Sequence, residues 1–127
     1  MPHSIRYDTE TQIVEVTNQG TVTLAGFKEI FSEALELAAK NGACPILSNY
    51  RGATLALSTV ELYNLHKLFE EVATSLGLDP QRLKRALIPS DQPDGFRFFE
   101  TVSENRGYVN VRVFHDVDDA KRWLTGK

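Results

Sequence analysis

Six polar side chains are of the types that hydrogen bond to the oxygen atoms of an anion. Their hydroxyl, amide, guanidinium and imidazole groups can all donate to a phosphate or a carboxylate. These residues are Asn49, Arg51, Ser58, Thr59, Ser90 and His115. We expect them to gather at one edge of a sheet, beside the first-turn amides of two helices, which favour negative charge. The structural alternative makes Ser58 only a helix cap, Asn49 only a turn residue and Arg51 only a surface cation.

The three histidines do not form a pattern typical of catalysis or of metal binding. His66 flanks an apolar helical stripe, His3 lies near the start of the chain, and Asp116 after His115 suits a helix cap. No histidine has a second histidine or a cysteine at a spacing such as i, i+4. The sequence also lacks a glycine-rich phosphate loop and a serine in a nucleophile elbow. We therefore expect no metal ion, no cofactor and no enzymatic activity.

Four aromatic residues form a candidate apolar patch. They are Tyr63, Phe96, Phe98 and Phe99. On a helix, Phe96 and Phe99 share a face, whereas Phe98 points elsewhere. Phe98 either widens a buried stripe or belongs to an exposed patch, which would indicate a protein partner, a lipid or an apolar pocket.

The first half of the chain predicts two strands, a helix and a third strand. Apolar and polar residues alternate over 4–7 and 13–16 around a polar turn, which is typical of a hairpin. Thr23 can cap a helix that extends to about Lys40, because apolar residues recur there at three- and four-residue spacing. Residues 45–49 form a short apolar run typical of a buried strand.

The second half begins with a capping box, Ser58-Thr-Val-Glu61, in which two side chains satisfy amides at the start of a helix. This helix ends near Gly77, where glycine suits the left-handed conformation. The remaining expected elements are a buried strand at 86–88, a helix from Ser90 or Asp91 to Gly107, a strand at or near a sheet edge at 109–113 and a helix capped by Asp116.

This order of elements predicts one α/β domain over residues 1–127. Strands that alternate with helices give a mostly parallel mixed sheet, here of about five strands with an N-terminal hairpin and four covering helices. Ligands of such sheets usually bind outside the carboxyl ends of the strands. The stretch 49–61 is therefore the predicted site.

Composition narrows the function classes. The 127 residues carry a formal net charge of −3, whereas nucleic-acid binding generally needs a basic stripe. The one basic cluster, Arg82, Lys84 and Arg85, is interpreted as a solvated face. Cys44 is the single cysteine, so we expect a buried thiol and no intramolecular disulfide. We expect a cytoplasmic protein with no integral membrane segment, because no apolar run is long enough to span a bilayer.

The element order and the last part of the sequence resemble a known group. The sequence reads VRVFHD at 111–116 and AKRWL at 120–124. A closing strand with an aromatic residue, an acidic helix start and a terminal Ala-x-x-Trp-Leu are similar to those of the SpoIIAA-like group of small bacterial STAS-related proteins. The resemblance implies their fold and a non-enzymatic regulatory or protein-interaction module. It also implies a protein partner or a second copy of the chain, as in a homodimer.

The same resemblance suggests a phosphorylation site. In anti-sigma-factor antagonists of this group, an aspartate ends the third strand, and Asp-Ser-Ser-Gly begins the second helix with its second serine phosphorylated by a partner kinase. Aligned without gaps, the strand-end aspartate falls on Asn49 and the phosphoacceptor on Thr59. Leu57 and Val60 stand where those relatives have the second aspartate and the glycine.

An alternative function comes from fold analogy. The lipid-carrying CRAL-TRIO domains are similar in fold, although fold alone does not determine function. By this analogy the chain would bind a small apolar or lipid-like ligand, and the aromatic patch would line the pocket.

Overall fold

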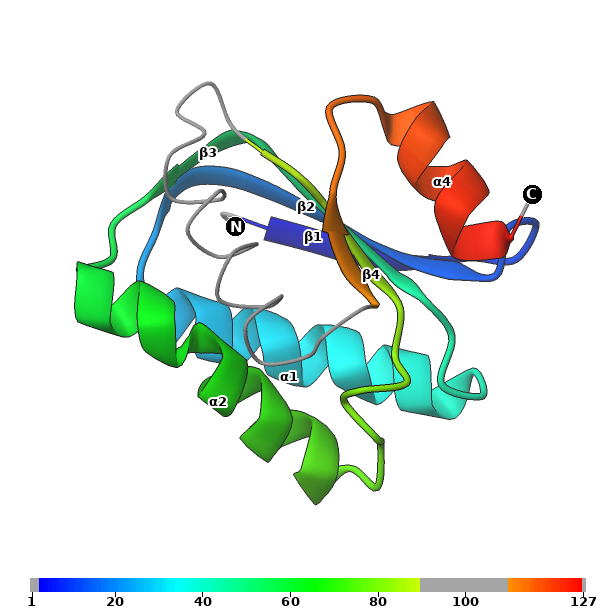
Figure 1. Cartoon of the computed structure of the whole chain (residues 1–127), viewed down its shortest axis with the longest axis horizontal. Coiled ribbons are helices and arrows are strands. Elements are labelled where there is room, and N and C mark those ends of the chain that lie inside the picture. The colour runs from blue at the N-terminus through cyan, green and yellow to red at the C-terminus, as the bar shows by residue number, and fades with distance from the viewer. Residues whose placement is uncertain (1–2, 90–109, 127) are drawn as a thin grey trace.

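The computed structural model describes residues 3–89 and 110–126, which form a five-stranded sheet and three helices (Figure 1). The strands are β1 His3–Asp8, β2 Ile13–Val22, β3 Ile46–Leu55, β4 Arg85–Ile88 and β5 Val111–Val113. The helices are α1 Leu24–Lys40, α2 Thr59–Ser75 and α4 Val117–Thr125. Helices α1 and α2 cover one face of the sheet, and α4 covers the other (Figure 1).

The strands lie side by side in the order of the chain, from β1 to β5. β1 pairs antiparallel with β2, and the other three pairings are parallel. The predicted mostly parallel sheet of about five strands, with its last strand at an edge, is thus confirmed. The expected hairpin is matched only in part, because β2 continues past β1 to Val22, where it pairs with Leu55 of β3.

The sheet divides the apolar core into two parts. Successive residues of a strand point to opposite faces, so neighbours in the sequence belong to different clusters. Val14 and Ile46 pack in the larger cluster beneath α1 and α2. Ile13 and Leu47 pack in a smaller cluster with Leu124 of α4.

The helix starts follow the predicted caps. The Thr23 hydroxyl accepts a hydrogen bond from the Gly26 amide at 3.2 Å, at the start of α1. The Asp116 carboxylate accepts one from the Asp118 amide at 2.9 Å, at the start of α4. Each bond satisfies an amide that has no partner within its own helix.

The predicted strand 45–49 is too short, since β3 runs on for six residues past Asn49. Between Asn49 and Gly52, β3 contains one residue more than the facing segment of β2 from Thr17 to Gln19. This extra residue makes a β-bulge. Two consecutive residues of β3 are exposed there. The alternation of buried and exposed residues that is typical of a strand is therefore interrupted, and this part of the sequence resembles a loop.

Part of the prediction lies outside the described residues. The segment for which a helix was expected, from Ser90 or Asp91 to Gly107, is not among the described residues. The same is true of Phe96, Phe98 and Phe99. Three helices are therefore described where the sequence predicted four. None of the described helices combines the length and the apolar character needed to cross a membrane.

Candidate functional site

The carboxyl edge of the sheet has two levels. β4 pairs with β3 only as far as Asn49, which lies opposite Ile88. β3 then continues to Leu55, and after the bulge it pairs with β2 again from Gly52 to Leu55. The first level, at Asn49, is close to the end of β4. The second level, at Leu55, leads to Ser58 and the start of α2.

Asn49 makes two hydrogen bonds that involve backbone groups at the bulge. Its Oδ1 accepts a hydrogen bond from the Arg51 amide at 2.9 Å. Its backbone carbonyl accepts another from Nδ2 of Asn18 on β2, at 3.3 Å. The Asn18 side chain was not singled out from the sequence, yet it is almost fully buried. Asn49 therefore has a local structural role, as the structural alternative expects.

Arg51 connects two distant segments. Its Nη2 donates a hydrogen bond to the backbone carbonyl of His115 at 2.8 Å. His115 lies in the turn between β5 and α4, and the bond therefore ties β3 to that turn. Both residues are largely exposed. The structure thus brings Asn49, Arg51 and His115 together at the first level of the edge.

Ser58 and Glu61 form the predicted capping box. The Ser58 hydroxyl accepts from the Glu61 amide at 3.1 Å, and the Glu61 carboxylate accepts from the Ser58 amide at 2.9 Å. Thr59, the candidate phosphoacceptor, is the first residue of α2. Val60 follows it and is 68 % exposed. Leu57 instead packs partly against the core.

The structure does not bring the capping box to the first level of the edge. In Figure 1 the start of α2 and the turn between β5 and α4 lie on opposite sides of the molecule. Arg51 and Leu55 are four residues apart in an extended strand, which corresponds to roughly 13 Å. The predicted cluster is therefore divided into two groups, and Ser90 lies outside the described residues.

A buried polar group on the α1 and α2 side of the sheet was missed by the sequence reasoning. It contains Ser48, Tyr50, His66 and Arg85, none of which is more than 9 % exposed. The interpretation of Arg85 as part of a solvated face is wrong, because this residue begins β4, which lies between β3 and β5, and is 4 % exposed. The sequence did contain a signal for this burial: an apolar run that predicts a buried strand follows Arg85 directly.

Burial shifts the pKa values of two residues in this group. It lowers the pKa of the Arg85 guanidinium, against the opposing effects of Tyr50 and Glu70. It also raises the pKa of the Tyr50 hydroxyl, although the nearby Arg85 charge and Ser48 act in the other direction. Both shifts follow from the cost of a charge in a poorly solvated place.

The buried polar group borders a small cavity between the sheet and the two helices α1 and α2. Ser48, Tyr50 and Arg85 contribute to its lining, together with mainly apolar side chains. Its volume is about 30 Å³, which suits one or two water molecules. A site for a drug-sized or lipid-like ligand has roughly 300 Å³ or more. Among the described residues this cavity therefore gives the apolar-ligand alternative no support, and the side chain of Tyr63 is not described.

Comparisons with known proteins bear on the fold. No family model matches the sequence, and no curated protein does. Among solved structures, the chain is similar to an uncharacterized protein of the DUF3478 family from Shewanella loihica PV-4, whose crystal structure has a SpoIIAA-like fold. The TM-score is 0.56 at 16 % sequence identity, over 96 % of this chain and 91 % of that one. The resemblance inferred from the sequence is confirmed at the level of architecture: this chain has a SpoIIAA-like fold.

Proposed function

We propose that this chain is a non-enzymatic protein-interaction module of the STAS-like type that acts in the cytoplasm. The observation that carries the proposal is the face of α2 that begins at Val60 and continues into a groove beside α1. A single exposed valine is ordinary on a protein surface. This one lies in the first turn of α2, within the capping box of Ser58 and Glu61, and on the helix face that continues into a larger concave surface.

The groove lies between α1 and α2. Val60, Asn64, Leu68 and Glu71 recur at three- and four-residue spacing, so they share one face of α2. The groove has a volume of about 530 Å³. Its lining consists of Leu24, Ala25, Lys28, Asn64, Lys67, Leu68 and Glu71. The apolar floor and the excess of lysine over glutamate fit a partner segment that presents apolar side chains together with carboxylates.

Two further observations support an interaction module. The fold is SpoIIAA-like, and the resemblance in sequence implies that a partner kinase contacts the start of the second helix. In addition, Asn49, Arg51 and Ser58 hold backbone groups in place. Side chains used in this way are better suited to shaping a surface than to transferring protons.

A finer version of the proposal assigns Thr59 as the phosphoacceptor of a regulatory switch. Thr59 lies beside Val60 in the first turn of α2, where the amides and the helix dipole favour added negative charge. A phosphate at this position would change the charge of the proposed contact surface directly.

Site-specific photo-crosslinking tests the interaction. A photo-reactive amino acid would replace Val60 or Lys67 in the full chain, expressed in its own cells. We expect a discrete adduct from both positions, in which mass spectrometry identifies either a second copy of the chain or another protein. The matched control position is Arg122, which is exposed on α4 at the other face of the sheet. The proposal fails if positions 60 and 67 give no adduct, or only the adducts that position 122 gives.

A further inference from the structure

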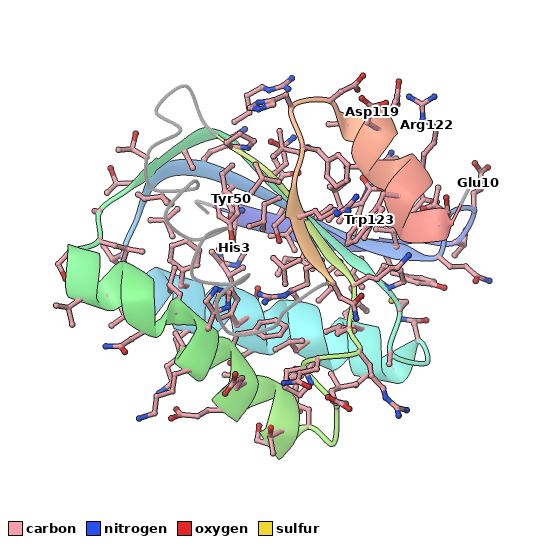
Figure 2. All side chains as sticks on the ribbon, in the orientation of Figure 1. His3, Glu10, Tyr50, Asp119, Arg122 and Trp123 are labelled. Atoms are coloured by element: carbon pink, nitrogen blue, oxygen red, sulfur yellow. The ribbon has the colours of Figure 1, made fainter. Side chains whose placement is uncertain are left out.

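Three potential metal ligands meet where β1 begins. The Nε2 atom of His3 lies 2.7 Å from a carboxylate oxygen of Glu33. Glu29 completes the group, and one ligand atom from each of the three residues lies within 4.8 Å of the others. The His3 side chain is only 5 % exposed, whereas the two glutamates are exposed. Figure 2 shows His3 on the side of the sheet that α1 covers.

The two glutamates are close enough to share a cation. They lie four residues apart on α1, where side chains are neighbours and like charges repel. Within residues 3–89 and 110–126, no lysine or arginine forms an ion pair with either carboxylate. The imidazole of His3 is the basic group that the fold places between them and the sheet.

A buried acceptor lies at the same end of the sheet. Asn18 is directly opposite His3 in the antiparallel pair of β1 and β2, so both side chains are on the same face. Asn18 is 1 % exposed, and its Nδ2 donates to the Asn49 carbonyl. Its Oδ1 atom has no hydrogen-bond partner among the described residues. A water molecule in the shell of a bound ion would supply the kind of donor that such an atom lacks.

We propose that His3, Glu29 and Glu33 bind a divalent transition-metal ion of the zinc type, which clamps the edge strand β1 to α1. An imidazole nitrogen and two carboxylate oxygens are zinc ligands, and a water molecule would complete a four-coordinate site. Magnesium and calcium are disfavoured, since they prefer sites made of oxygen ligands.

The required rearrangement is small. Ligand atoms of a tetrahedral zinc site are about 3.4 Å apart, from bond lengths of about 2.1 Å. His3 and Glu33 would therefore separate by less than 1 Å from their present 2.7 Å, and Glu29 would approach. Both glutamates are exposed and can change rotamer freely. Sequence spacing missed this group, because the histidine comes from a strand and only the carboxylates from the helix.

Calorimetric titration with ZnCl₂ tests the proposal. The experiment uses the full chain with any affinity tag removed, in a buffer that does not chelate zinc. We expect saturable binding of one ion per chain, and no comparable heat with MgCl₂. His3→Ala and Glu33→Gln should each weaken zinc binding by about tenfold or more.

Two control variants separate this site from adventitious binding. Glu36→Gln removes an exposed carboxylate from the same helix, and His115→Ala removes an exposed imidazole elsewhere. Both should bind zinc as the unchanged chain does. In an NMR spectrum of the imidazole protons, ZnCl₂ should shift the His3 resonances and leave those of His66 in place. The proposal is overturned if zinc gives no saturable binding, or if His3→Ala binds it as tightly as His115→Ala; the pair of His3 and Glu33 is then a simple ion pair.

Discussion

The guanidinium carbon of Arg85 lies 3.5 Å from the centre of the Phe69 ring. Arg85 begins β4 and Phe69 is on α2, so this cation–π contact joins an interior strand of the sheet to a covering helix. Both residues are nearly inaccessible to solvent. An arginine in this position contributes packing through its long apolar stem as well as charge.

Replacing Arg85 should therefore be costly. Arg85→Ala should lower the free energy of unfolding by about 2–4 kcal/mol, because it removes the contact with Phe69 and enlarges a cavity. Arg82→Ala is the matched control, since the Arg82 side chain is 88 % exposed in the same basic segment. Its loss should stay below about 0.5 kcal/mol. Denaturant titration measures both, and equal losses would contradict the buried role of Arg85.

The capping box at the start of α2 should stabilise the helix through two linked hydrogen bonds. Ser58→Ala should cost about 1 kcal/mol of unfolding free energy. Glu61→Ala removes the reciprocal bond, and the double variant should lose less than the sum of the two single losses. A change within about 0.3 kcal/mol of zero for Ser58→Ala, measured by denaturant titration, would show that Ser58 does not act as the cap.

Local patterns of this kind explain which features could be predicted. The caps at Thr23, Ser58 and Asp116 each join residues two or three positions apart, so the sequence displays them directly. Alternating apolar residues likewise predicted the first two strands and the last one, and short apolar runs predicted the two strands between them.

Other features depend on segments that the sequence does not place together. The extension of β3 past Asn49 relies on pairing with β2, and the bulge hides it by shifting the alternation. Arg85 is buried because of the strands and helices around it, although its neighbour Arg82 is a surface residue. The same holds for His3, whose glutamate neighbours come from a helix later in the chain.

Phosphorylation of Thr59 is the sharpest test of the regulatory version of the function. Protein purified from its own cells should contain a fraction with one phosphate-sized mass increment, because the first turn of α2 can stabilise a phosphate. The increment should disappear in Thr59→Ala and persist in Thr21→Ala, which changes an exposed threonine on β2. If no growth condition yields the increment, the phosphoswitch is rejected, while the proposal of an interaction surface at Val60 stands on its own test.

Cys44 should be an inert thiol in the folded chain. It is 7 % exposed, and burial raises the pKa of its thiol above the ordinary value of 9.0. A thiol-specific reagent such as DTNB reacts with the thiolate, so the native protein should react slowly at pH 8 and the denatured protein quickly. Equal rates for native and denatured protein would contradict the burial of this side chain.

The same shift predicts how stability depends on pH. Between pH 9.0 and the raised pKa, the folded chain keeps a proton on Cys44 that the unfolded chain has lost. At this group the unfolded state then binds fewer protons, so the contribution of Cys44 to the free energy of unfolding falls as the pH rises through this range. Cys44→Ala lacks the titrating group and should not show this part of the decline. Denaturant titrations of both proteins at pH 8 and pH 10 measure the difference: relative to Cys44→Ala, the unchanged chain should lose stability at the higher pH, and a gain would show that the pKa shift has the opposite sign.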